Sequence, residues 1–572
     1  MHVISTAGHV DHGKSTLVRT LTGTDPDRWA EEKARGLTID LGFASCTLPS
    51  GRGIAIIDVP GHVRFIRNML AGVGAVDACI FVVAATEGWK PQSEEHLRIL
   101  ELLGVQHGVI ALTKVGVADD DLRELARIDV EEHVAGTFLE DAELIEVDCI
   151  AGIGVDELRA ALDRLLDSTP TATDVGRPRL WIDRAFAAKG AGTVVTGTLT
   201  GGRLRVDDEI VVWPSGRHVR VRGLQSHYES RTKIGPGHRV AVNLSGVAHE
   251  DVERGDVLVG PAQWHVTRRI DAELRVLGSL NHVVSRRGAY VAYIGSGEQP
   301  IKLRILGPNS IAPGNVGIVR MHLPVGLPLL PGDRFVLRES GRAETVGGGE
   351  VLDVEPVVPA SRARPDRSVD RVIAERRWIE PDRLLLLTGE KRPPNVGKWI
   401  AGPEEFERTM ASLRARIAAA GPLGLDVATL DEHERATLPL LEEIGVDSGR
   451  ARPRAQADPL ADHPYVAALE AALLAPPDPA GIDRGELREL VKSGRVVDVD
   501  GVFFAPAAFD RASQLCAELL REHADGFTVA DFRDAAHNSR KHALPILKHL
   551  DATGVLRRRG DLRIAGPRLL GK

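Results

Sequence analysis

The stretch Gly8-His9-Val10-Asp11-His12-Gly13-Lys14-Ser15 matches the pattern G-x-x-x-x-G-K-[ST]. It lies between an apolar strand-like run and a helical stretch, which is the context in which this pattern binds phosphates. Its glycines let backbone N–H groups wrap around phosphate oxygens, and the following helix directs its N-terminus at their negative charge. We expect Lys14 to reach the β- and γ-phosphates and the Ser15 hydroxyl to bind Mg²⁺. A chance glycine loop is the alternative, and the flanking strand and helix argue against it.

The alternation of strands and helices continues outward from this loop through residues 1–170. Apolar runs typical of buried strands occupy residues 54–57, 78–83 and 109–112. The segment between two of them, residues 94–103, has helical spacing. This alternation predicts a doubly wound α/β domain with a largely parallel sheet.

Two later segments carry groups that can respond to a terminal phosphate. Arg35-Gly36-Leu37-Thr38-Ile39 precedes a strand, and Thr38 is expected to close on Mg²⁺ and the γ-phosphate only while that phosphate is present. Asp58-Val59-Pro60-Gly61-His62 follows a strand, so that Asp58 can hold a magnesium-bound water and the Gly61 N–H can contact the γ-phosphate. Loops ordered by a γ-phosphate and released on its hydrolysis form a two-state switch.

His62 is the candidate that orients the attacking water, because phosphoryl transfer requires mainly positioning and charge stabilisation from the protein. Its alternative role is that of a solvated histidine in a loop.

The rest of the chain changes character twice. Short β-branched runs with frequent turn signals predict two small antiparallel β-barrels, at residues 177–262 and 268–358. Residues 364–572 are helical and rich in Ala, Leu, Arg and Glu. A unit of two helices and a short hairpin repeats there, most clearly at residues 482–504 and 527–564, and it predicts winged-helix modules, four in number with two degenerate.

Composition limits the class of protein further. The chain has 572 residues, 43% of them apolar and 27% charged, which is ordinary for a soluble multidomain protein. No apolar run reaches the ~18 residues of a membrane span, and we expect no membrane partner. The cysteines, Cys46, Cys79, Cys149 and Cys516, are far apart, which argues against a zinc site or disulfide framework and fits the cytoplasm.

Charge is unevenly distributed. The net charge is −8, but residues 531–572 contain ten Lys or Arg against four Asp or Glu. A basic end on an acidic chain indicates a polyanionic partner.

The motifs at residues 8–15, 35–39, 58–62 and 91–96 together resemble the translational GTPases of the elongation factor Tu group. The resemblance implies that GTP and Mg²⁺ are the cofactors, with Ser15, Thr38 and Asp58 at the metal. It also implies that the residue at His62 orients water on the ribosome, and that apolar residues at Val10 and Leu37 gate this histidine.

The chain departs from that family where the guanine base is read. The family has Asn-Lys-x-Asp, whereas this chain has Thr113-Lys114-Val115-Gly116, so the carboxylate that accepts from the guanine N1 and N2 hydrogens is missing at Gly116. Loss of such a group should weaken base discrimination sharply. A second base-contacting motif, Ser-Ala in the family, is replaced by Asp148-Cys149. Asp119 or Asp120 is a possible substitute for the missing carboxylate.

The first barrel resembles the selenocysteine-specific elongation factors in Trp181 to Gly190 and in Gly192-Thr193-Val194-Val195-Thr196-Gly197. The resemblance implies that selenocysteyl-tRNA is bound, with Asp183, Arg184 and Arg239 lining the amino-acid pocket. A selenol is more acidic than a thiol of pKa ~8.5, so fixed arginines can favour its anion over neutral serine. A surface ion pair between Asp183 and Arg184 is the alternative.

In the same family the C-terminal extension consists of winged-helix repeats, and the last one binds a hairpin in the messenger RNA. Here the last module covers about residues 512–572, and Asn538 to Pro545 opens its expected recognition helix. Residues 543, 544, 546, 547 and 550 are expected to face the core. Arg540, Lys541 and Lys548 on the helix and Arg557-Arg558-Arg559 on the wing are expected to contact the RNA backbone. A solvated basic face without a ligand is the alternative.

Three functional hypotheses follow. The first is a monomeric GTPase that delivers selenocysteyl-tRNA to the ribosome at UGA codons marked by an mRNA hairpin. The second is a general tRNA-carrying translation factor. The third is a non-hydrolysing RNA-binding adaptor with a decayed nucleotide site, which Gly116 and Asp148 favour and which the intact Lys14, Thr38 and His62 oppose.

Overall fold

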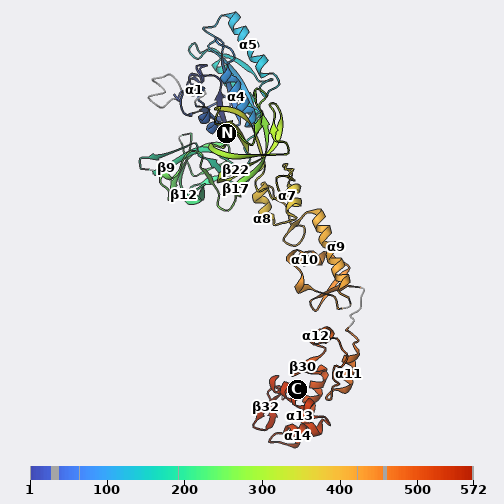
Figure 1. Cartoon of the computed structure of the whole chain (residues 1–572). Coiled ribbons are helices and arrows are strands. Elements are labelled where there is room, and N and C mark those ends of the chain that lie inside the picture. The colour runs from blue at the N-terminus through green and yellow to red at the C-terminus, as the bar shows by residue number, and fades with distance from the viewer. Residues whose placement is uncertain are drawn as a thin grey trace. The chain divides into compact units, whose positions relative to one another are not determined.

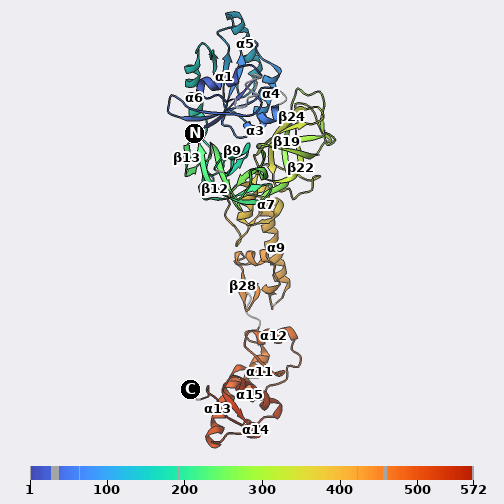
Figure 2. The same ribbon diagram turned by 90° about the vertical axis from the view of Figure 1, so that its left-hand side faces the viewer.

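A computed structural model describes residues 2–26, 38–62, 65–190, 192–227, 229–421, 423–454 and 460–569. The expected Arg35 and Leu37 therefore lie outside the described residues. The chain divides into two compact units, residues 1–393 and 394–572. Figure 1 and Figure 2 show the elements of each unit from two sides.

The first domain of unit 1 is a six-stranded sheet covered by helices on both faces. Its sheet order is β2-β3-β1-β4-β5-β6, and all neighbours are parallel except β2 and β3. The strands are β1 (His2–Ala7), β2 (Gly42–Thr47), β3 (Gly53–Asp58), β4 (Ala78–Ala84), β5 (Gly108–Thr113) and β6 (Leu144–Val147). The helices are α1 (Lys14–Thr22), α3 (Ile66–Val73), α4 (Pro91–Leu102), α5 (Asp120–Val134) and α6 (Val155–Ser168).

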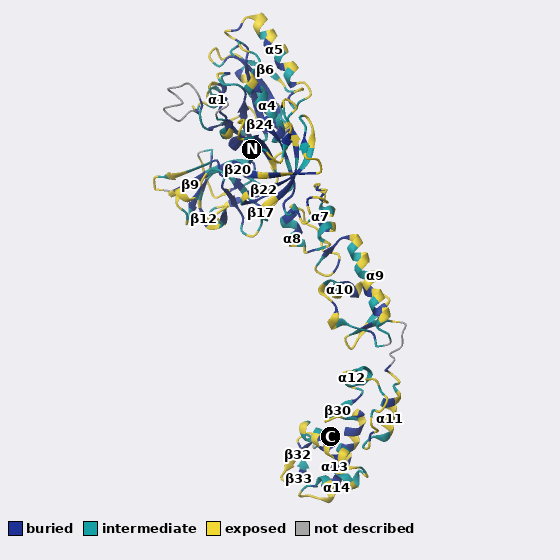
Figure 3. Cartoon of the chain, viewed as in Figure 1, coloured by how far each residue is buried: buried dark blue, intermediate teal, exposed yellow. Residues whose placement is uncertain are grey.

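The burial of these strands follows from their position between two helical layers. Every residue of β4 is buried, because side chains on both faces of a central parallel strand meet a helix. Helices α1 and α6 share one apolar core with the sheet, and α3, α4 and α5 share the other. Figure 3 shows the sheet as the buried centre and α5 as largely exposed. The predicted α/β domain is confirmed.

The second domain is an antiparallel sheet that closes on itself, because β11 pairs with both β16 and β12. Its main strands are β7 (Arg179–Trp181), β8 (Arg184–Ala188), β9 (Gly192–Thr200), β11 (Glu209–Trp213), β12 (Arg217–Ser226), β13 (Glu229–Arg231), β15 (His238–Ser245) and β16 (Val257–Val259). A small ladder joins β10 (Leu204–Arg205) to β14 (Lys233–Ile234).

The third domain is a closed barrel with the order β17-β22-β20-β19-β23-β24. Strand β20 alternates buried and exposed residues along most of its length, as expected for a barrel wall with one face in the core. The strands are β17 (Val266–Val276), β18 (Val284–Ser285), β19 (Tyr290–Ile294), β20 (Gly297–Leu306), β21 (Ser310–Ile311), β22 (Val316–Pro328), β23 (Arg334–Glu339) and β24 (Glu344–Asp353). Both predicted barrels are confirmed.

Unit 1 ends with two short helices, α7 (Val369–Arg376) and α8 (Pro381–Thr388), separated by β25 (Trp378–Ile379). Arg371 of α7 pairs with Asp353 at the end of β24 at 3.0 Å, and both side chains are largely buried. The first part of the expected winged-helix region therefore packs against the second barrel.

Unit 2 contains three successive groups of helices, each followed by a β-hairpin. Strand β26 (Ile400–Ala401) precedes them. The first group has α9 (Pro403–Ala419), β27 (Leu425–Asp426), α10 (Glu432–Thr437), β28 (Ile444–Asp447) and β29 (Arg450–Pro453). The second has α11 (Pro464–Ala472), α12 (Arg484–Lys492), β30 (Val497–Val499) and β31 (Val502–Phe504). The third has α13 (Pro506–Glu522), α14 (Val529–Ala535), α15 (Arg540–Ala552), β32 (Leu556–Arg559) and β33 (Leu562–Ala565).

These groups have the helix and hairpin order of winged-helix modules, so the predicted fold class is confirmed at this end of the chain too. The count of four modules and their boundaries stay predictions. Within the described residues, no helix is both long enough and apolar enough to cross a membrane.

Candidate functional site

The phosphate loop connects β1 to α1 at the carboxyl edge of the sheet, where parallel α/β sheets bind ligands. Two glycines are required by its shape. Gly8 has φ +128°, and a Cβ there would lie 2.1 Å from the Val82 carbonyl oxygen. Gly13 has φ +87° at the start of α1. Both positions bring backbone N–H groups close to where phosphates bind, as the motif predicts.

Lys14 lies in this loop with its ammonium group buried. Its Nζ donates to the Gly8 carbonyl at 3.0 Å and to the His9 carbonyl at 2.6 Å. Burial lowers the Lys14 pKa to about 8, although the nearby Asp58 carboxylate raises it. The loop thus holds a cation whose two carbonyl partners can be replaced by phosphate oxygens.

Three oxygen-bearing side chains converge beside Lys14. The Ser15 hydroxyl donates to Asp58 Oδ2 at 2.6 Å and lies 2.7 Å from the Thr38 hydroxyl. The Thr6 hydroxyl fixes the other carboxylate oxygen, donating to Asp58 Oδ1 at 2.7 Å. Mg²⁺ prefers hard oxygen ligands and usually takes one or two carboxylates together with phosphates and water. The residues present therefore fit a magnesium site.

His62 and Gly61 follow Asp58 at the same edge. A Cβ on Gly61 would lie 2.4 Å from Lys14 Nζ and 2.6 Å from the Val10 nitrogen, so this backbone must pass close to the phosphate loop. His62 is partly buried, and its ring centroid lies 5.9 Å from that of Phe65. The structure brings Gly61, the residue before His62, against Val10, while the other expected gate residue, Leu37, is outside the described residues.

The loop after β5 is tied to the phosphate loop. The Thr113 hydroxyl donates to the His12 carbonyl at 2.6 Å. Lys114 has φ +59°, and its Nζ donates to Glu87 at 3.2 Å. Neither expected substitute for a carboxylate at Gly116 points there: Asp119 caps α5 by accepting from the Leu122 N–H, and Asp120 pairs with Arg123.

A carboxylate does lie beside Gly116, and it belongs to Asp148. The Gly116 N–H donates to Asp148 Oδ2 at 2.9 Å. Asp148 is not among the site residues that the sequence predicts, because the separate departures at Gly116 and Asp148 do not by themselves show that the two residues are in contact. The sequence does contain one sign of this contact. A carboxylate is lost at one base-reading position, Gly116, and a carboxylate is gained at the other, Asp148.

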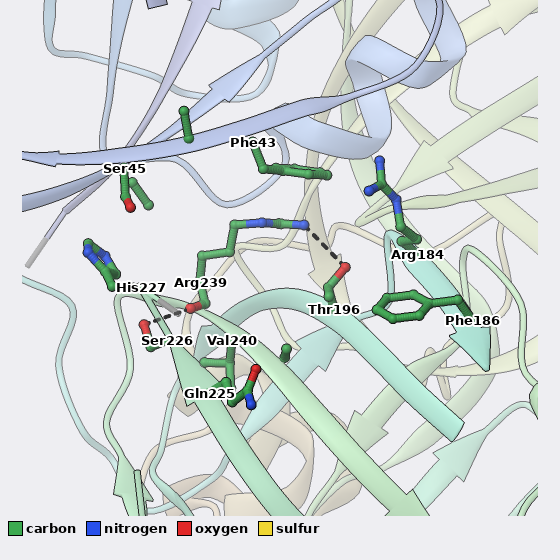
Figure 4. A pocket seen from close by; sticks show the side chains of 13 residues that line it. Phe43, Ser45, Arg184, Phe186, Thr196, Gln225, Ser226, His227, Arg239 and Val240 are labelled. Atoms are coloured by element: carbon green, nitrogen blue, oxygen red, sulfur yellow. Dashed lines mark hydrogen bonds between the residues drawn. The ribbon is translucent and has the colours of Figure 1, made fainter. Parts of the chain in front are cut away.

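A cavity of about 220 Å³ lies between the first domain and the first barrel (Figure 4). Strand β2 contributes Phe43 and Ser45, and the barrel contributes the other side chains labelled there. The expected Arg184 and Arg239 both line it. Among its described lining residues none is acidic, and Arg184 and Arg239 are the two arginines that face the cavity.

Arg239 is held rigidly in this wall. Its guanidinium makes a two-point ion pair with Asp183, at 2.6 and 2.8 Å, and contacts the Thr196 hydroxyl at 3.2 Å. The guanidinium carbon also lies 3.4 Å from the Phe43 ring centroid. A paired, stacked arginine keeps one orientation and presents a fixed face to a ligand.

The partner of Asp183 is therefore Arg239 and not Arg184, so the alternative of a surface pair between Asp183 and Arg184 is wrong. Asp183 is 4% exposed and lies between β7 and β8, and its pair with Arg239 connects this segment to β15. Arg184 instead donates to the Leu41 carbonyl at 3.0 Å and lies 3.8 Å from Asp40. Asp183 therefore positions Arg239, and Arg184 and Arg239 both face the cavity.

Sequence reasoning missed several residues of this cavity, notably Phe43, Thr196 and His227. Burial lowers the His227 pKa, so this imidazole is mostly neutral near pH 7. The missed residues come from segments that only the packing of two domains brings together. Local sequence patterns carry no sign of that packing.

The basic residues expected to bind RNA are all exposed on the last module of unit 2. Arg540 and Lys541 open α15, and Arg557, Arg558 and Arg559 form β32 at the wing. Two lysines already have acidic neighbours: Lys541 Nζ pairs with Asp478 at 2.7 Å and Lys548 Nζ with Asp500 at 2.7 Å. These exposed pairs are weak and can exchange for phosphate contacts.

One expectation for α15 is wrong. Leu544 was assigned to the core but is 45% exposed, whereas Pro545 is buried. Ala543, Ile546, Leu547 and Leu550 are buried as expected. Their spacing of i, i+3, i+4 and i+7 forms one face, and Leu544 lies next to that face.

Known protein domains match separate parts of this chain. Residues 1–168 match the elongation factor Tu GTP binding domain, residues 192–259 match elongation factor Tu domain 2, and residues 518–565 match the winged helix of elongation factor SelB. The chain is 40% identical over 351 residues to a selenocysteine-specific elongation factor of Desulfomicrobium baculatum, a match that covers 61% of this chain and 55% of that one. It is 37% identical to the Escherichia coli (strain K12) factor of the same name, covering 62% and 56%. The matches thus span little more than half the length of these two curated relatives.

Two further comparisons cover their partners more fully. Elongation factor Tu 2 of Streptomyces avermitilis is 32% identical over 386 residues, which cover 62% of this chain and 96% of that protein. The crystal structure of a bacterial selenocysteine-specific elongation factor, EF-Sec, superposes with a TM-score of 0.72 at 26% identity, covering 99% of both chains. The chain therefore belongs to the elongation factor Tu family of GTP-binding translation factors, and it is a relative of the selenocysteine-specific members.

Proposed function

We propose that this protein is a GTPase that delivers selenocysteyl-tRNA to the ribosome at UGA codons marked by an mRNA hairpin. The observation that carries the proposal is the small cavity with two fixed arginines and no acidic side chain among its described lining residues. The relatives' names and the winged-helix match support the same assignment.

At the nucleotide site, Lys14 binds the β- and γ-phosphates once they replace its carbonyl partners. Ser15, Thr38 and Asp58 hold Mg²⁺, which neutralises charge on the phosphates when bound. His62 orients the water that attacks the γ-phosphate, and the ribosome brings this side chain into place. Thr38 belongs to the segment that leads into β2, so nucleotide state and the cavity share one stretch of chain.

In the cavity, Arg184 and Arg239 favour a small anionic side chain. A selenol ionises more readily than a thiol, whose pKa is ~8.5, whereas the serine hydroxyl stays neutral. Asp183 keeps Arg239 in place through two hydrogen bonds and does not line the cavity itself. Because the arginine is fixed beforehand, little conformational entropy is lost when the anion binds.

At the other end of the chain, the exposed residues Arg540, Lys541 and Arg557 to Arg559 bind the backbone of the mRNA hairpin. The phenylalanines of this module, Phe509, Phe527 and Phe532, are all buried. Stacking of bases on these rings is therefore excluded, and backbone contacts dominate the interaction.

The test is protection of the aminoacyl ester from hydrolysis, with selenocysteyl-tRNA and seryl-tRNA compared on the same tRNA in the presence of a non-hydrolysable GTP analogue. We expect selective protection of the selenocysteyl ester. Arg184→Met should reduce this selectivity by about 10- to 100-fold, since a hydrogen bond to a charged group contributes ~1.5–3 kcal/mol. Arg220→Met, which removes an exposed arginine of β12 in the same barrel, is the matched control and should leave selectivity unchanged.

The other outcomes select the other hypotheses. Equal protection of both esters would indicate a general tRNA carrier. Protection of neither, together with absent ribosome-stimulated GTP hydrolysis, would indicate an RNA-binding adaptor.

A further inference from the structure

The loops that follow β5 and β6 meet at one carboxylate. Asp148 comes directly after β6, and Gly116 lies in the loop after β5, at the same edge of the sheet as the phosphate loop. The Thr113 hydroxyl ties the β5 loop to the phosphate loop through the His12 carbonyl. A base attached to a nucleotide whose phosphates lie on Lys14 must extend along this edge. Asp148 is therefore placed where a base can be recognised.

Asp148 fills the space that a side chain at position 116 would occupy. A Cβ built on Gly116 would lie 2.6 Å from Asp148 Oδ2 and 3.1 Å from its Cγ. Gly116 is not at a positive φ, so its backbone does not require glycine. The glycine is instead required by the neighbouring carboxylate, and the two positions form a matched pair.

Hydrogen bonds hold this carboxylate in one orientation. Asp148 Oδ1 accepts from the Ile150 N–H at 2.9 Å and the Ala151 N–H at 2.8 Å, and Oδ2 accepts from Gly116 at 2.9 Å. The bonds from Ala151, Gly116 and Ile150 hold the Asp148 pKa below its usual value despite the opposing effect of burial. These three donors occupy three of roughly four acceptor directions of a carboxylate. The remaining direction is on Oδ2, the oxygen beside Gly116.

We propose that Asp148 reads the guanine base, with Oδ2 accepting from both the N1–H and the N2–H of guanine. This inference rests on the proposed GTP function and specifies how that nucleotide is selected. The two guanine donors lie side by side, so they share one oxygen in a three-centre contact. Adenine has no such pair of donors on this edge, so it leaves the remaining acceptor direction of Asp148 Oδ2 without a partner.

The competing explanation is that Asp148 only shapes its own loop through the bonds from Ile150 and Ala151. A loop-shaping role predicts sensitivity to substitution but no change in which base is preferred. The base preference therefore distinguishes the two explanations, whatever happens to stability.

The first experiment measures equilibrium binding of GTP, ITP and XTP to the full chain and to Asp148→Asn. ITP lacks the N2 amino group, and XTP has an acceptor oxygen in its place. We expect the wild type to bind GTP about 10- to 100-fold more tightly than ITP, because the charged acceptor then has one donor fewer. In Asp148→Asn the Ile150 and Ala151 N–H groups hold the amide oxygen at the Oδ1 position. The amide NH₂ then loses the Gly116 contact and faces the base, so the preference inverts in favour of XTP.

The matched control is Asp119→Asn, which makes the same chemical change in the neighbouring loop, where Asp119 caps α5. It should keep the wild-type order of affinities. The inference is overturned if Asp148→Asn keeps that order, or if Asp119→Asn inverts it.

A second experiment moves the carboxylate between the two positions. Asp148→Ser should lose guanine selectivity, and Gly116→Asp alone should weaken GTP binding because it places a second carboxylate against Asp148. The double variant of Gly116→Asp and Asp148→Ser has room for the new side chain and should recover GTP affinity to within about tenfold of the wild type. Gly116→Asp would then weaken GTP binding in the wild type but strengthen it beside Asp148→Ser, and only interacting positions produce such a reversal. A double variant no tighter than Asp148→Ser would count against a shared role.

Failure of the inference and failure of the proposed function give different results. If the wild type binds no guanine nucleotide, the proposed GTP function is wrong. If the wild type selects GTP and Asp148→Asn selects it equally well, only the assignment of Asp148 is wrong.

Discussion

Lys14 illustrates how burial of one side chain makes ligand binding depend on pH. Its pKa is lowered to about 8, so near this pH half of the molecules lack the positive charge that phosphates require. A bound triphosphate stabilises the charged form and raises the pKa. GTP affinity should therefore fall as the pH rises from 7 to 8.5, and binding at pH 8 should take up about half a proton.

The measurement is calorimetry of GTP binding in buffers of different ionisation enthalpy. At pH 6.5 Lys14 already carries its proton, so this group should contribute no uptake there. An affinity that is constant between pH 7 and 8.5, with no proton uptake at pH 8, would contradict the effect.

His62 supplies a second prediction at the scale of one residue. It lies beyond Gly61, whereas the residues expected to bind Mg²⁺ are Ser15, Thr38 and Asp58. His62→Ala should leave GTP affinity within about twofold and slow ribosome-stimulated hydrolysis by about 100-fold or more, a typical loss when a group that positions a proton or water is removed. Single-turnover hydrolysis with saturating ribosomes is the measurement. Unchanged turnover would remove His62 from the mechanism.

At the scale of elements, the wing of the last module has two unequal faces. Leu556 is buried, and Arg558 pairs across the hairpin with Arg563, which is itself buried against Asp551. Side chains alternate along a strand, so Arg557 and Arg559 lie on the opposite, outer face. The module therefore presents these two arginines away from its own core.

Arg557→Gln and Arg559→Gln should each weaken hairpin binding more than Arg558→Gln does. Each should also lower the slope of the salt dependence by about one unit for every phosphate that the arginine had neutralised. Arg521→Gln, on the exposed side of α13 in the same module, is the control. Binding measured across a salt series provides both quantities. Equal effects of all four substitutions would indicate a diffuse charge attraction.

The elements also show how far sequence reasoning reaches. Periodicity and turn signals predicted the α/β sheet, both barrels and the terminal hairpins, because each strand, helix and turn carries its own local pattern in the sequence. The apolar pattern of α15 places Leu544 in the core, which is wrong. An apolar residue beside the buried face of a helix differs little in sequence pattern from an apolar residue on that face. Periodicity could not pair Asp183 with Arg239 or bring Phe43 over the cavity, because those contacts depend on barrel register and on the packing of two domains.

At the scale of the whole molecule, the chain divides after Pro393, beyond the boundary expected near residue 364. The two helices in between contact the second barrel, and Arg371 is buried in that contact. A chain that ends at Pro393 should keep nucleotide binding and protection of the selenocysteyl ester, and it should lose hairpin binding. A chain that ends at residue 364 should be less stable, because it leaves Asp353 buried without Arg371.

Ester protection, hairpin binding and thermal unfolding of both truncated chains are the measurements. Retention of hairpin binding by residues 1–393 would place the RNA-binding surface in unit 1 and contradict its assignment to the last module. Equal unfolding midpoints for the two chains would show that α7 and α8 contribute nothing to unit 1.

Phe43 connects the two sites of unit 1 in a way that has a thermodynamic consequence. The Phe43 ring covers Arg239 in the cavity. Phe43 also follows closely after Thr38, whose hydroxyl lies 2.7 Å from that of Ser15, and after Asp40, which pairs with Arg254 of the barrel at 2.6 Å. A segment that touches both sites couples their binding free energies, and such coupling is reciprocal. If GTP raises the affinity for the charged tRNA by some factor over GDP, then the tRNA must raise the preference for GTP over GDP by the same factor. Under the proposed function, binding of the correct aminoacyl-tRNA therefore shifts the nucleotide equilibrium from GDP towards GTP.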